Sequence, residues 1–231
     1  MKMNHIDYLK AKDVIYEDNH IIAINKPAGI LVQGDKTGDK SLLDLTKFYL
    51  KKKYNKPGDA FIGLPHRIDR PASGIVLLSK TSKSLSRLSL LFKEKNIQKK
   101  YWVIVKKEIN KKSGTLIHYL KKNKNKNKSF VSNEEKAGYL KSELKYQLLK
   151  KLNKFLLYEI QLITGRHHQI RAQLSHIGSP IKGDIKYGSK RTNNDGSICL
   201  HAKEITFTHP VKKEKIIINA PLPKNGIWNY C

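Results

Sequence analysis

Short apolar runs separated by turn residues dominate the pattern of this chain. Two of them, at 14–16 and 21–24, have the turn residues Asp18 and Asn19 between them and predict two short strands joined by a turn. The segment 155–163 alternates apolar and polar residues, which is typical of a strand with one buried face. Other runs predict strands at 74–78, 101–105, 205–207 and 216–218.

Helical spacing appears in three segments. Ser41 is suited to cap a helix over 41–50 that buries Leu42, Leu45 and Tyr49. A second helix is expected to begin at Thr81 or Ser82, and a third covers 167–177. The low-complexity segment 121–128, KKNKNKNK, predicts a solvated loop. Strands and helices without a regular βαβ rhythm predict a strand-rich α+β fold.

The charge balance changes the picture. Lys and Arg number 46 against 19 for Asp and Glu, a formal net charge of +27 that is spread over all 231 residues. Such a surface attracts polyanions, because phosphate binding releases condensed counterions. Nucleic acid is the first partner to consider and an anionic membrane surface the second. The alternative is a lysine-rich composition that only keeps the protein soluble.

Cysteine usage and hydropathy indicate the compartment. Cys199 and Cys231 are the two cysteines and form no CxxC pair, which argues against a disulfide scaffold and fits a reducing compartment. The first 20 residues hold no apolar run like that of a signal peptide. No stretch approaches the ~18 apolar residues that a membrane span needs. We therefore expect a soluble cytoplasmic protein without membrane contact.

Arginine is scarce and clustered. Four of the six arginines lie in the segments 66–74, HRIDRPASG, and 164–171, TGRHHQIR. Asp69 in the first segment is flanked by two arginines, so we expect it to be ionised and able to act as a nucleophile or a base. A structural salt bridge is the alternative. Arg166 lies at a strand–helix junction, where functional groups are common, although an exposed basic helix start would have the same pattern.

Other chemistry finds no support in the motifs. The histidines show no HExxH spacing, and no Cys–His spacing matches a zinc finger. There is no GxGxxG, no GxxxxGK[ST] and no GxSxG. We therefore expect neither a metal ion nor a cofactor.

Four ordered motifs carry a resemblance to a known family. The segment HRIDRPASGIVLLSKT at 66–81 resembles the signature of RNA pseudouridine synthases of the RluA type. INKPAG at 24–29, KKYW at 99–102 and TGRHHQIRAQLSHIGSPIKGD at 164–184 are similar to the other motifs of this family. The resemblance implies a pseudouridine synthase fold, with a mixed, mostly antiparallel sheet, flanking helices and a central RNA-binding cleft.

The resemblance also implies residue roles. Asp69 is implied to be the catalytic nucleophile, and Arg67 to fill the gap left when the target nucleotide is flipped out of its stack. Tyr101 is implied to stack on the target base, and Arg166 to pair with the catalytic aspartate. Lys26 is taken as structural support. His167 departs from the commonest pattern, in which Thr or Lys fills this slot.

The implied activity is the isomerisation of specific uridines in ribosomal or transfer RNA. This rearrangement exchanges no electrons and imports no group, so it needs no cofactor. We expect one catalytic domain over 1–231, without an accessory RNA-binding domain ahead of it, and a monomer. The main alternative is a non-catalytic RNA-binding or ribosome-assembly protein on the same fold. A glycosidase-like hydrolase ranks last, because such enzymes usually need two carboxylates.

Overall fold

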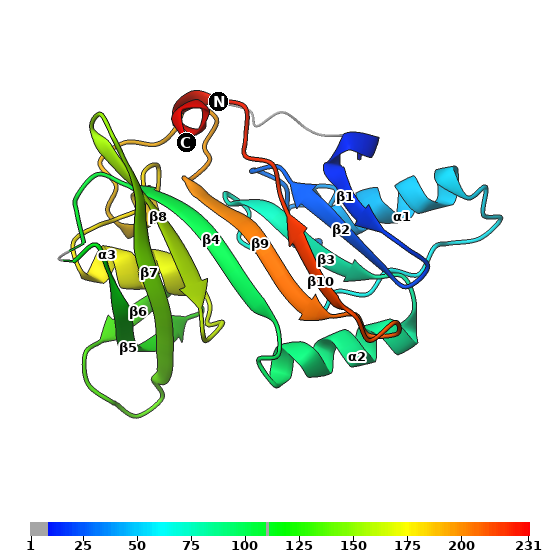
Figure 1. Ribbon diagram of the computed structural model, residues 1–231, viewed down its shortest axis with the longest axis horizontal. Coiled ribbons are helices and arrows are strands. Elements are labelled where there is room, and N and C mark those ends of the chain that lie inside the picture. Colours follow the sequence, from blue (N-terminus) through cyan, green and yellow to red (C-terminus); the bar gives the residue numbers. More distant parts are fainter. Residues whose placement is uncertain (1–8, 110) are drawn as a thin grey trace. The chain divides into compact units, whose positions relative to one another are not determined.

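Strands predominate in the computed structural model, which describes residues 9–109 and 111–231 (Figure 1). Its three α-helices are α1 (Leu42–Lys53), α2 (Ser82–Lys93) and α3 (Gln169–His176). The strands are β1 (Val14–Glu17), β2 (Ile21–Lys26), β3 (Ser73–Ser79), β4 (Gln98–Val105), β5 (Ser113–Asn123), β6 (Lys128–Ser132), β7 (Leu140–Leu152), β8 (Phe155–Leu162), β9 (Leu200–Thr208) and β10 (Lys215–Asn219). Short 3-10 helices are η1 (Ala11–Asp13), η2 (Ile185–Tyr187) and η3 (Gly226–Tyr230). The predicted α+β class is confirmed.

The chain forms two compact units. The first holds the described residues up to Ile97 together with Ala202–Leu222, and the second holds Gln98–His201 and Pro223–Cys231. In the first unit the strand order is β1-β2-β3-β9, and β10 pairs with β9. In the second unit the order is β4-β8-β7-β5-β6, so that β6 is the last strand. The pairs β1–β2, β2–β3, β9–β10, β4–β8, β8–β7, β7–β5 and β5–β6 are antiparallel.

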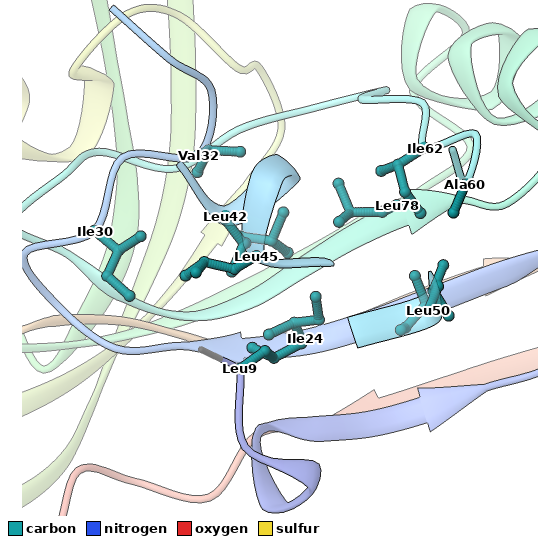
Figure 2. Packing of buried hydrophobic residues seen from close by; sticks show 12 residues of the cluster. Leu9, Ile24, Ile30, Val32, Leu42, Leu45, Leu50, Ala60, Ile62 and Leu78 are labelled. Atoms are coloured by element: carbon teal, nitrogen blue, oxygen red, sulfur yellow. The ribbon is translucent and has the colours of Figure 1, made fainter. Parts of the chain in front are cut away.

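The core of the first unit lies where α1 packs on β2 and β3. Leu42, Leu45 and Leu50 of α1 join Ile24 and Leu78 in one buried cluster, which Figure 2 shows at close range. The helix begins as predicted, because the Ser41 hydroxyl accepts from the backbone of residue 44 and the carboxylate there accepts from the Ser41 N–H. All seven residues of β3 are buried. The strand that follows the Asp69 loop is therefore held on both faces.

A close backbone approach fixes the start of β3. Gly74 has φ +107°, a left-handed conformation that favours glycine. A Cβ atom at this position would overlap the backbone carbonyl oxygen of Ala202 on β9. The glycine therefore allows β9 to lie directly against the strand that carries the end of the HRIDRPASG motif.

The second unit contains two long strands that the apolar runs did not predict, β5 and β7. In β7, buried Ser142, Leu144 and Tyr146 alternate with exposed or half-buried residues. The segment 121–128 is only partly the loop expected for it, because β5 continues to Asn123 and β6 begins at Lys128. Backbone pairing with β6 extends the ladder into this polar sequence, since tertiary pairing overrides local composition.

Candidate active site

Asp69 lies in the loop that leads into β3 of the first unit. Its backbone carbonyl accepts a hydrogen bond from Ala72 N at 3.1 Å, which closes a turn directly before the strand. The Asp69 residue is half-buried, whereas Arg67, two residues earlier, is exposed. The turn therefore presents an accessible arginine and a partly shielded carboxylate from one short segment.

Lys26 supports this loop through hydrogen bonds to backbone carbonyl groups. Its side chain is completely buried, and Nζ donates to the carbonyl oxygens of Pro27 and Ile30 at 2.9 Å and of Arg70 at 3.2 Å. Burial lowers the pKa of Lys26 to about 7, while the negative charge of Asp69 acts in the opposite direction. One side chain thus joins the end of β2 to the residue that follows Asp69, which agrees with the structural role expected for it.

Arg70 ties the same two segments together a second time. Its Nε donates to the Gly29 carbonyl at 2.9 Å, and Gly29 N donates to the Arg70 carbonyl at 2.8 Å. Its Nη2 forms an ion pair with Asp39 at 2.6 Å. Arg70 is therefore a brace for the loop. No sequence pattern indicated Asp39, because an ion pair across 31 positions leaves no local signal.

In the second unit, β4 brings Tyr101 and Lys99 toward the Gly165 turn. Tyr101 is 8% exposed and pairs with Ile160 of β8. Lys99 Nζ lies 3.3 Å from where a Cβ atom on Gly165 would be. Burial lowers the pKa of Lys99. The pairing of β4 with β8 therefore places the KKYW motif and the start of the TGRHHQIR segment at the same end of β8.

A buried glutamine holds the loop that carries Arg166. Gln169 Oε1 accepts from Thr164 Oγ1 at 2.8 Å and from Arg166 N at 2.9 Å. Its Nε2 donates to the Glu143 carbonyl at 3.1 Å, which fixes the loop to β7. Arg166 itself is exposed, and its Nε donates to the Lys141 carbonyl at 3.2 Å. The sequence analysis did not single out Gln169, which is the first residue of α3 and lies three positions after Arg166.

The two histidines after Arg166 continue this support. The His167 and His168 rings stack with centroids 3.8 Å apart. His168 has φ +51°, an uncommon conformation outside glycine. Ser129 Oγ donates to the His167 carbonyl at 2.6 Å, and the His168 ring contacts the Tyr187 hydroxyl at 3.1 Å. These contacts connect the loop to β6 and η2. His167, the residue that departs from the commonest family pattern, therefore contributes to local packing.

Arg171 has a structural role. Its side chain is 5% exposed, and the guanidinium makes a two-point ion pair with Asp184, with distances of 2.7 and 2.8 Å. The ring of Tyr187 lies 5.0 Å from the guanidinium carbon. Of the four clustered arginines, Arg70 and Arg171 are thus bound within the protein, whereas Arg67 and Arg166 are exposed.

The structure therefore places two of the four expected site residues in each unit. Arg67 and Asp69 share one loop of the first unit, and Tyr101 and Arg166 lie near one end of β8 in the second. The pairing of Asp69 with Arg166 and the central RNA-binding cleft would involve both units and stay predictions.

Within residues 9–109 and 111–231, no three His, Cys, Asp or Glu side chains gather closely enough to hold a metal ion. None of the helices in the same ranges has both the length and the apolar composition needed to cross a bilayer.

Comparison with known proteins identifies the family. Residues 20–176 match the family model described as RNA pseudouridylate synthase. The chain is 34% identical over 223 residues to ribosomal large subunit pseudouridine synthase C of Buchnera aphidicola subsp. Baizongia pistaciae, covering 90% of this chain and 66% of that protein. The protein of the same name from Rickettsia prowazekii is 36% identical over 219 residues, with coverage of 94% and 68%.

Solved structures agree on the fold. Human RNA pseudouridylate synthase domain containing 4 superposes with a TM-score of 0.79 at 22% identity, covering 92% of this chain and 89% of that one. A second human protein, RNA pseudouridylate synthase domain containing 1, superposes with a TM-score of 0.71 at 21% identity. The chain spans 66% and 65% of the length of the Buchnera and Vibrio vulnificus relatives. The motifs, the fold and the family match agree, and the chain belongs to the RNA pseudouridylate synthase family.

Proposed function

We propose that the chain is an RNA pseudouridine synthase with Asp69 as its nucleophile. The observation that carries this proposal is the position of Asp69 within the matched residues 20–176, in a loop braced by Lys26 and Arg70. Isomerisation breaks the bond from ribose C1′ to uracil N1 and forms a bond from C1′ to C5. The proton on C5 leaves and N1 gains one, so atoms and charge balance without a cofactor.

The other site residues act on the flipped nucleotide. Arg67 is exposed, as a group that fills the vacated space in the RNA must be. Tyr101 would stack on the uracil, and Arg166 would orient the Asp69 carboxylate through its planar fork. The hydrogen bonds of Gln169 hold the backbone of the Arg166 loop. They therefore limit the positions that the Arg166 guanidinium can adopt.

Ribosomal RNA is the proposed substrate. Relatives that share 34–36% identity with this chain are named for the large ribosomal subunit. A net charge of +27 suits a target held through its phosphates. Transfer RNA is the alternative target, and pseudouridine mapping of total RNA from cells with and without the gene separates the two.

The Asp69→Asn variant tests the assignment. Asparagine is nearly isosteric but is not an anionic nucleophile, so pseudouridine formation is expected to stop while RNA affinity and the melting temperature stay normal. Asp59→Asn, at an exposed loop position of the same unit, is the matched control. Turnover by purified Asp69→Asn would refute the proposal, and normal RNA binding without any turnover by the wild-type protein would favour the non-catalytic alternative.

The Arg166→Lys variant tests the pairing with Asp69. Lysine keeps the charge but lacks the fork, so most of the rate should be lost with RNA affinity little changed. Arg191→Lys, at another exposed arginine of the second unit, is the control. A normal rate, or weaker RNA binding with a salt dependence shallower by about one unit, would identify Arg166 as a phosphate contact instead.

We also propose that the enzyme needs no metal ion and works as a monomer with one catalytic domain. Activity on prefolded RNA should survive dialysis against a chelator, and a strict requirement for added zinc would contradict this.

Sedimentation should give the mass of one chain, and the two units should unfold in one transition.

A further inference from the structure

A hollow lies in the second unit, at the turn between β7 and β8. It has a volume of about 560 Å³, and its walls come from residues 150–155 and from the C-terminal turn η3. Lys150 Nζ donates to the Tyr230 carbonyl at 2.9 Å, which ties η3 to the end of β7. The pocket is therefore formed by two segments that a hydrogen bond holds together.

The pocket lies at the far end of β8 from the Arg166 loop. Phe155 begins β8 and pairs with Leu152 at the turn, whereas Leu162 ends the strand just before the Arg166 loop. Seven residue steps at about 3.3 Å each separate Phe155 from Leu162 by roughly 23 Å. Tyr101 pairs with Ile160, toward the Arg166 end of the strand. Within this unit the pocket is thus separate from the Arg166 loop, at the other end of β8.

The walls combine aromatic rings with cations. Phe155 and Tyr230 line the pocket, and the Tyr230 side chain is among the most exposed large apolar groups, at 69%. Lys150, Lys151 and Lys154 line it as well. The carboxylate of Glu108 lies 3.8 Å from Lys151, but both groups are about half exposed, so this ion pair neutralises little.

We propose that this pocket binds one unpaired nucleotide of an RNA strand, with its base on the Tyr230 ring and its flanking phosphates on Lys151 and Lys154. Exposed aromatic rings beside lysines are the arrangement by which proteins hold single strands without reading sequence. A purely apolar ligand would place no negative charge beside the three lysines that line the pocket, of which Lys151 and Lys154 make no hydrogen bond to its walls within the residues that the structure describes. The inference rests on the proposed function, because it assigns the enzyme a contact to its RNA away from the target uridine.

Binding of a labelled oligoadenylate tests the stacking contact. This probe contains no uridine, so the isomerisation cannot act on it. Tyr230→Leu keeps apolar area but removes the ring, and it should weaken binding about tenfold at constant salt. Tyr230→Phe keeps the ring and should bind like the wild type. Ultraviolet cross-linking followed by mass spectrometry should recover the probe on the peptide that contains Tyr230.

The lysines are tested by salt dependence. The double variant Lys151→Gln and Lys154→Gln should reduce the slope of log K against log salt by about 1.4, because each single-strand phosphate contact contributes about 0.7. Lys51→Gln with Lys52→Gln, on the exposed end of α1, removes the same charge and should leave the slope unchanged. Equal slopes in the two double variants would overturn the assignment.

The outcomes also separate this inference from the proposed function. Asp69→Asn should bind oligoadenylate normally. If uridine isomerisation depends on Asp69 but Tyr230→Leu binds the probe like the wild type, the pocket assignment alone is wrong. If binding of the probe depends on Tyr230 but no isomerisation occurs, the proposed function alone is wrong. If Tyr230→Leu or the Lys151 and Lys154 double variant lost binding to vesicles of anionic lipid while binding oligoadenylate normally, the pocket would be a membrane contact. That result would overturn the inference.

Discussion

Replacement of Lys26 by methionine offers a sharp test of how the Asp69 loop is held. Lys26 is fully buried and its Nζ faces three carbonyl groups. Its pKa is about 7 in the folded protein, against 10.5 for an ordinary lysine. Because the pKa is lowered on folding, the unfolded chain binds more protons between these two values. The free energy of unfolding therefore rises with pH in this window.

The magnitude follows from two opposing effects. Releasing the Lys26 proton on folding costs about 1.4 kcal/mol for each pH unit below 10.5, which is about 5 kcal/mol at pH 7 and about 2 kcal/mol at pH 9. Methionine avoids this cost, but it leaves two carbonyl groups that a neutral amine would satisfy, at about 2 kcal/mol each. Lys26→Met should thus be close to neutral at pH 7 and destabilise the protein by about 2 kcal/mol at pH 9.

Urea unfolding followed by circular dichroism at pH 7, 8 and 9 measures this difference. Both tryptophans lie in the second unit, so fluorescence would not report on Lys26 directly. Lys52→Met, at an exposed position of α1, is the control and should show no widening gap with pH. A loss of several kcal/mol already at pH 7 that does not grow toward pH 9 would refute the lowered pKa. It would show that the three carbonyl groups keep Lys26 protonated.

Three further predictions concern packing and pH. Arg171→Leu strands the buried carboxylate of Asp184 and should lower the free energy of unfolding by about 3–5 kcal/mol in urea titrations, with recovery when Asp184 is also made apolar. Gly74→Ala should cost more than about 2 kcal/mol in thermal unfolding, because of the left-handed φ and the overlap with β9, whereas Gly58→Ala, in open space, should be tolerated. Burial and the nearby His176 lower the pKa of His118 below its usual 6.5. The folded state then binds fewer protons, so the melting temperature should fall from pH 7 to pH 5.5, and less so in His118→Gln.

The parts of the fold that the sequence predicted are those with strong local signals. The Ser41 cap, the buried run of β3 and the alternation in β8 each appear within a few residues. The strand β7 was missed because its outward positions are mostly charged or amide residues, such as Lys141, Glu143, Lys145 and Gln147, and its inward ones include Ser142. That serine is buried, with Oγ donating to the Leu140 carbonyl at 3.0 Å. Hydropathy alone cannot reveal such a position.

The candidate site divides in the same way. Motif resemblance singled out Asp69, Arg67, Tyr101 and Arg166, whose proposed roles depend on RNA chemistry. Among the groups that hold them it indicated Lys26 but not Gln169, because the contacts of Gln169 with β7 join positions 26 apart in the chain. Lys26, Arg70 and Gln169 all lie within the family motifs, as the site residues do, so only the tertiary contacts separate the supporting role from the proposed catalytic one.

The position of β6 at the end of its strand order has a consequence for handling the protein. A terminal strand can pair with a strand of another molecule, which is a common route to aggregation. Here the strand has only five residues, begins with Lys128 and follows the lysine-rich turn 124–127. Repulsion between these charges would oppose edge-to-edge pairing, but salt screens exposed charges within about 3 Å at 1 M. Concentrated salt should therefore promote self-association through this edge, while moderate salt keeps the molecules apart.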